Sequence, residues 1–109
     1  METIDAEVVR QLAQELSPAT LRSVIGTFEA DLGRLAQELM ASGQSGDASG
    51  YRRAAHSIAG ASAAVGALRL AREARLAMNP AHDEPPHVVM PRIMREAQAA
   101  IGALRDLLG

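Results

Sequence analysis

Apolar side chains recur at the three- and four-residue spacing of an amphipathic α-helix in successive segments of this chain, and this pattern limits the folds open to it. The clearest stripe lies in residues 18–41 and consists of Leu21, Val24, Ile25, Phe28, Leu32, Leu35 and Leu39. Hydrophobic residues make up 48% of the chain, but aromatic residues only 2%. A core of small and aliphatic side chains suits helices better than sheets, which favour β-branched and aromatic residues. The sequence therefore predicts an all-α fold.

Start and stop signals place the first two helices. Thr3 or Asp5 can cap a short first helix that is expected to end near Leu16. Ser17 followed by Pro18 is a second start signal, because proline at the first helical position lacks only an N–H group that would be unpaired there anyway. We expect a long second helix over residues 18–41.

The middle of the chain contains a segment rich in glycine and serine, which favour turns. Residues 42–49 (SGQSGDAS) are predicted to form a turn, in which Asp47 is the natural N-cap of the next helix. A third helix is expected from Ala48 to about Val65. Gly66 marks a kink or a restart before a further helical segment over residues 68–78.

The C-terminal part contains one more helix behind a loop that cannot be helical. Residues 79–86 (NPAHDEPP) carry three prolines, which block helix continuation. A last helix is expected over residues 87–108, with Met94 in its core stripe and Pro91 near its first turn, where proline is tolerated. A short helix followed by four longer ones buries its stripes most economically as an antiparallel four-helix bundle with a short extra N-terminal helix. We expect residues 1–109 to form this single domain.

Charge and composition exclude several classes of function. The net charge of −2 makes neither nucleic acid nor an anionic membrane an obvious partner, and the absence of cysteine excludes disulfides and thiolate chemistry. No apolar signal segment or membrane span is present, so we expect a soluble, cytoplasmic protein. The chain has no Walker-type or kinase-type glycine loop, so no ATP site is assigned. Nor is a metal or other cofactor expected, because the spacing of His82, Asp83, Glu84 and His87 fits no strong ligand motif.

His56 is the candidate functional residue. In a helical projection at 100° per residue it lies about 200° from Ile58, so the imidazole points to solvent if the apolar stripe is core. Gly60 is notable because glycine inside a helix costs about 1 kcal/mol relative to alanine. A solvated face normally carries long polar side chains, whereas small ones predominate here. The same projection places these residues around His56 on the outward face: Arg52, Arg53, Ala59, Gly60, Ala63 and Ala67.

The segment AHSIAGASAAVGALRL, which contains His56, resembles the signature of histidine-containing phosphotransfer (HPt) domains of bacterial phosphorelays, A-H-x-L-K-G-x-S-x-x-x-G-A-x-x-L. The two align without a gap. The resemblance places the phosphorylated histidine at His56, and Gly60, Ser62, Gly66 and Leu70 match further signature positions. We expect the Ser62 hydroxyl to hydrogen-bond to the backbone of the preceding helical turn rather than to take part in catalysis.

The resemblance implies a phosphocarrier. His56 would accept a phosphoryl group from a receiver-domain aspartate and pass it to another receiver. Such a protein is not an enzyme acting on ATP; it is a monomer whose partners are response-regulator receiver domains, a hybrid histidine kinase, or both.

One departure from the signature leaves an alternative open. The lysine that the family carries three residues after the histidine is Ala59 here. The chain is then alternatively a docking-only module that binds receivers or kinases without efficient transfer, unless Arg52 and Arg53 supply the missing cation. A dimerising sensor-kinase bundle is a third reading. Four core stripes in one chain count against it, because they can close a bundle without a second copy.

Overall fold

The computed structural model describes residues 2–108, which form five α-helices and contain no β-strand. The helices are α1 (Ala6–Glu15), α2 (Pro18–Ser45), α3 (Ala48–Ala64), α4 (Leu68–Met78) and α5 (Pro86–Asp106). The all-α prediction is confirmed. None of these helices is both long enough and apolar enough to span a membrane.

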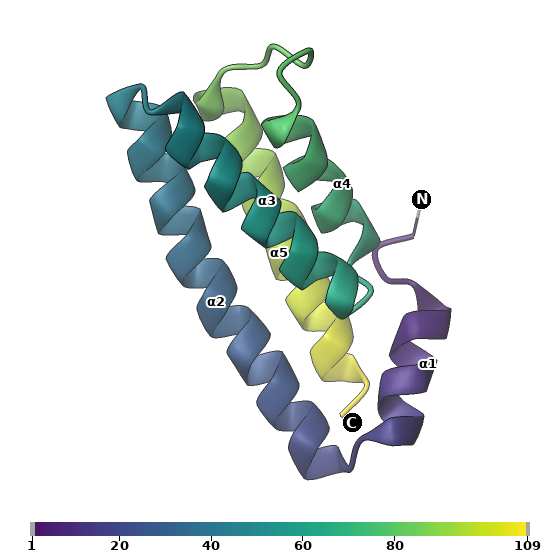
Figure 1. The fold of residues 1–109 in the computed structure, drawn as a ribbon. Helices are drawn as coiled ribbons and strands as arrows, with labels where there is room; N and C mark the ends of the chain where they lie inside the picture. Colours follow the sequence, from purple (N-terminus) through teal and green to yellow (C-terminus); the bar gives the residue numbers. More distant parts are fainter. Residues whose placement is uncertain (1, 109) are drawn as a thin grey trace.

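Helices α2 to α5 run up and down in turn as an antiparallel four-helix bundle, and α1 lies at one end of it (Figure 1). Helix α3 packs against α2 and α4, while α5 closes the bundle by packing against the same two helices. Consequently α3 and α5 lie diagonally opposite each other, and the outer face of α3 is separated from α5 by the core. The predicted bundle with a short extra N-terminal helix is confirmed.

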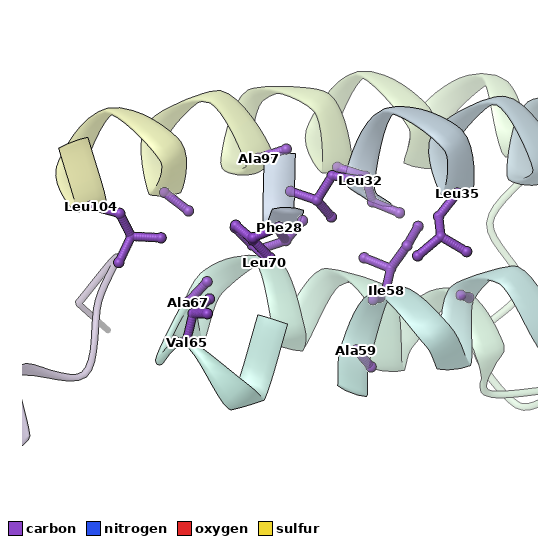
Figure 2. Packing of buried hydrophobic residues seen from close by; sticks show 14 of the residues in the cluster. Phe28, Leu32, Leu35, Ile58, Ala59, Val65, Ala67, Leu70, Ala97 and Leu104 are labelled. Carbon is purple, nitrogen blue, oxygen red and sulfur yellow. The ribbon is translucent and has the colours of Figure 1, made fainter. Parts of the chain in front are cut away.

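The core is filled by aliphatic side chains from all four bundle helices. Figure 2 shows Ile58 of α3 pointing toward Leu32 and Leu35 of α2. The largest apolar side chains with almost no exposed surface are Ile25, Leu39, Ile58, Leu70, Val89, Ile93 and Leu104. Burial of such side chains contributes roughly 1.5–3 kcal/mol each before the entropy of ordering the chain is counted, so it provides the main drive for folding.

The predicted caps are confirmed for three helices. Asp5 accepts hydrogen bonds from the backbone at the start of α1, Ser17 accepts from Thr20 N at 3.2 Å, and Asp47 accepts from Gly50 N at 2.9 Å. Pro18 occupies the first turn of α2, as expected. Each cap satisfies an N–H group that has no partner inside its own helix.

Three local predictions are wrong. Helix α2 continues to Ser45, so the turn predicted over residues 42–49 shrinks to Gly46 and Asp47, with the left-handed Gly46 (φ 75°) ending the helix. Pro91 is the sixth residue of α5 rather than part of its first turn, because the helix already begins at Pro86. Met94, predicted in the core stripe of this helix, is 41% exposed.

Gly66 reverses the chain between α3 and α4 and joins α1 to the bundle. Its φ of 74° is left-handed, and a Cβ atom here would lie 3.1 Å from the Cβ of Val8. The backbone of Asp5 donates to Gly66 O at 2.7 Å, and Leu68 N donates to Thr3 O at 3.0 Å. The predicted interruption at Gly66 is confirmed, and glycine is needed there for conformation and for space.

Candidate functional site

His56 occupies the middle of α3 and is exposed. Its neighbours Ala54, Ala55 and Ile58 are buried at 3%, 0% and 0% exposure, and they fix the rotation of the helix against the bundle. Because the apolar stripe faces inward, the imidazole faces solvent. The predicted orientation of His56 is confirmed.

Four of the residues predicted to surround His56 share its exposed face. Arg52 and Arg53 lie one turn before the histidine, Gly60 lies one turn after it, and Ala63 follows two turns after it. The arginines point to opposite sides of α3. Arg52 lines a depression with the end of α4, and Arg53 lines a groove of about 460 Å³ against α2.

Ala59 and Ala67 do not belong to this face, although the projection placed them there. Ala59 is only 6% exposed and Ala67 is fully buried. The projection assumed a single inward stripe, whereas α3 is covered on both flanks by α2 and α4. Ala59 lies two turns after Arg52, on the flank that faces α4, and Ala67 lies beyond the end of α3, where it pairs with Ile4. These two residues are therefore removed from the candidate docking face.

Gly60 has no function inside the folded chain that would explain a glycine. It lies in the interior of α3 and is exposed, and a Cβ atom added there meets nothing within 4 Å. This contrasts with Gly66, where a close approach and a left-handed φ both require glycine. Gly26, Gly33 and Gly102 are equally open positions inside helices, so what distinguishes Gly60 is its place one turn from the imidazole of His56.

The chain matches the family model described as Hpt domain over residues 6–107. It belongs to the Hpt domain family. The chain is thereby placed among the histidine phosphotransfer modules of phosphorelays, which work with receiver domains and histidine kinases.

A solved structure shares the fold of this Hpt domain. The crystal structure of histidine-containing phosphotransfer protein B (HptB) from Pseudomonas aeruginosa PAO1 superposes with a TM-score of 0.87 at 23% sequence identity. The match covers 97% of this chain and 94% of that one. A comparison with curated proteins finds no sequence match.

Ser62 of the Hpt domain differs from its prediction. The side chain is fully buried, and its Oγ atom has no hydrogen-bond partner among residues 2–108. The expected bond back to the preceding turn is absent from this part of the chain. Sequence reasoning found the position but not the environment, because the packing of α4 over this flank of α3 is a long-range property.

The polar loop before α5 forms an ion-pair network rather than a ligand cluster. Arg92 donates to Glu84 at 2.9 Å and lies 3.1 Å from Glu73 of α4, while His82 also contacts Glu84. Hydrogen bonds from Arg92 and His82 lower the pKa of Glu84 to about 2. Within residues 2–108 no group of His, Asp and Glu side chains is arranged to hold a metal ion. The network ties the loop to α4 and α5, away from His56.

Proposed function

We propose that His56 carries the phosphoryl group of this Hpt domain. An imidazole nitrogen attacks the phosphorus of an aspartyl phosphate on a receiver domain, an N–P bond forms, the P–O bond breaks, and the aspartate leaves as a carboxylate. The ring then carries the phosphoryl group on one nitrogen and its only N–H proton on the other, and it becomes neutral again when that proton passes to water. The reverse reaction passes the group to a second receiver.

The observation that carries this proposal is the exposed pair of His56 and Gly60 in α3. In-line transfer requires the reacting atoms to approach within about 3–3.5 Å in a fixed orientation. A partner can come that close only where the side chains beside the imidazole are short or absent. Gly60 and Ala63 provide such a surface, and the buried stripe of α3 holds it in place.

The proposed reaction makes modest demands on this chain. It supplies the nucleophile and a surface for docking, while the phosphoryl group arrives already activated on the partner's aspartate. No ATP-dependent catalysis is needed, which supports a carrier rather than an enzyme. We also propose that the chain works as a one-domain monomer, since α2 to α5 already close one core; a dimer in sedimentation would contradict this.

The test is transfer from a panel of phosphorylated receiver domains, with the label on the Hpt domain measured against time. His56→Ala is expected to abolish labelling. His82→Ala and His87→Ala are the matched controls, because they remove the other two histidines of the chain and are expected to leave labelling intact. Labelling that survives in His56→Ala would refute the assignment of the acceptor.

A docking-only module is the second candidate, and the alanine at position 59 favours it. The family's lysine position is occupied here by an uncharged side chain that is only 6% exposed, so it contributes no cation beside His56. This alternative predicts receivers that bind in calorimetry but leave the chain unlabelled. If transfer occurs, Arg52→Gln and Arg53→Gln show whether these arginines assist it: a lowered rate supports their role, and unchanged rates exclude it.

A further inference from the structure

The helix that carries His56 and its neighbour α4 are strongly cationic, although the chain as a whole is not. Helices α3 and α4 together contain five arginines and one acidic residue, Glu73, while the net charge of the chain is −2. Glu73 lies 3.1 Å from Arg92 of α5, so its charge is directed away from α3. Positive charge is therefore concentrated on one side of the bundle.

Most arginines elsewhere in the chain are neutralised by neighbours. Within residues 2–108, ion pairs of 4.0 Å or less hold Arg10, Arg34, Arg92 and Arg105. None of the five arginines of α3 and α4 enters such a pair in the same part of the chain. Unpaired cations of one sign on adjacent helices sum to a field that attracts an anionic partner.

The packing of α4 shows which of its arginines accompany His56. Leu70, Ala71 and Ala74 are buried, so Arg72 projects away from the core at 100° per residue. Arg75 and Glu73 lie on opposite flanks of this buried stripe. Because Glu73 faces α5, Arg75 lies on the flank that faces α3.

Arg75 and Arg72 are also level with the site along the bundle. Helices α3 and α4 are antiparallel and reverse at Gly66, with His56 ten residues before it and Arg75 nine residues after it. Equal rise per residue then places Arg75 at the level of His56, and Arg72 at the level of Gly60, along the axis of the bundle.

From this placement we infer that Arg72 and Arg75 of α4 extend the docking surface and attract negatively charged groups of the receiver domain that docks on His56. The inference rests on the proposed function and adds to it the α4 side of the interface and the charge of the partner. Charged pairs of this kind act mainly on the rate of association, and salt weakens them.

The experiment measures the second-order rate constant of phosphoryl transfer from the best receiver at low and at raised salt. The variant is Arg72→Glu with Arg75→Glu. The matched control is Arg22→Glu with Arg95→Glu, which makes the same change in net charge at two exposed arginines outside α3 and α4. All four side chains are exposed, so thermal unfolding should confirm that both proteins fold like the wild type.

The α4 variant is expected to lower the rate constant about tenfold at low salt, with the difference shrinking as salt is added, while the control changes it less than about twofold. Equal losses in both variants would mean that only net charge matters and would overturn the inference. So would an unchanged rate in the α4 variant while the wild type transfers normally, a result that leaves the proposed function standing. If the wild type accepts no label from any receiver, the proposed function itself fails.

A nucleic acid is the competing anionic partner, and the same proteins test it. A labelled DNA duplex is expected not to bind the wild type at physiological salt. Binding that the α4 variant abolishes, with transfer unaffected, would assign the arginines to nucleic acid and overturn the inference.

Discussion

Replacing Gly60 by alanine should make the protein more stable and the proposed transfer slower. The backbone there is helical and exposed, and the added Cβ atom meets nothing within 4 Å. Alanine removes the conformational freedom that glycine gives the unfolded chain, and it introduces no contact in the folded one. A receiver docked on His56, by contrast, would meet the new methyl group.

The stability gain follows from helix propensity. Alanine is favoured over glycine in a helix interior by about 0.8–1.0 kcal/mol. With an unfolding entropy of about 2.1 cal/mol/K per residue, a gain of about 1 kcal/mol raises the Tm of a chain of this length by roughly 4 °C. On the functional side, displacement of a reacting group by about 1 Å can cost on the order of 100-fold in rate, so we expect a loss of at least about tenfold.

Two controls separate these effects. Gly26→Ala tests an exposed glycine inside α2 with equally open space, and Gly102→Ala does so on α5, diagonally opposite α3. Both should raise the Tm and leave transfer unchanged; the gain at Gly102 should be smaller because it lies near the helix end. Urea or thermal unfolding gives the stability, and timed transfer from a phosphorylated receiver gives the rate.

The reasoning would be refuted in either of two ways. A Gly60→Ala protein that is less stable than the wild type would show that the glycine has a packing role inside the chain. A protein that is more stable and transfers at the wild-type rate would show that docking does not need the missing side chain at Gly60.

Three further changes test other parts of the structure. Gly66→Ala should destabilise the protein by at least about 1–2 kcal/mol in chemical denaturation, because φ is left-handed and Val8 is close; an unchanged midpoint would contradict this. The Glu84 pKa is lowered to about 2 by Arg92 and His82, so its stabilising effect is present above about pH 4.5 and is lost as the pH falls toward 2. Glu84→Gln should therefore lower the Tm at neutral pH and flatten its fall between those pH values, and a parallel curve would exclude the contribution. Asp47→Ala should cost about 1 kcal/mol by removing the N-cap of α3, whereas no loss in a denaturation curve would show that the cap is dispensable.

The sequence predicted most of the fold because its signals are local. Capping side chains such as Ser17 and Asp47 act on the next turn of backbone, and the apolar stripes are long enough to define each helix. The end of α2 was missed because residues 42–45 have weak helical propensity and are held by the helix before them. The left-handed Gly46 is the true stop signal there.

The site was predicted less completely, since burial on the flanks of α3 depends on its neighbours. A projection of one helix placed His56 and Gly60 correctly but could not show that Ala59 is buried. For the same reason, the sequence did not show that Arg72 and Arg75 lie level with the His56 site, because this depends on the antiparallel packing of α3 and α4.

The most direct test of the account is to locate the phosphoryl group on the chain after transfer from a receiver. Peptide mass spectrometry at neutral to alkaline pH preserves the acid-labile N–P bond and distinguishes the three histidines. The account predicts a single phosphoryl group on His56 of α3, lost on acid treatment. A group on His82 or His87, or an acid-stable group on any hydroxyl, would contradict it.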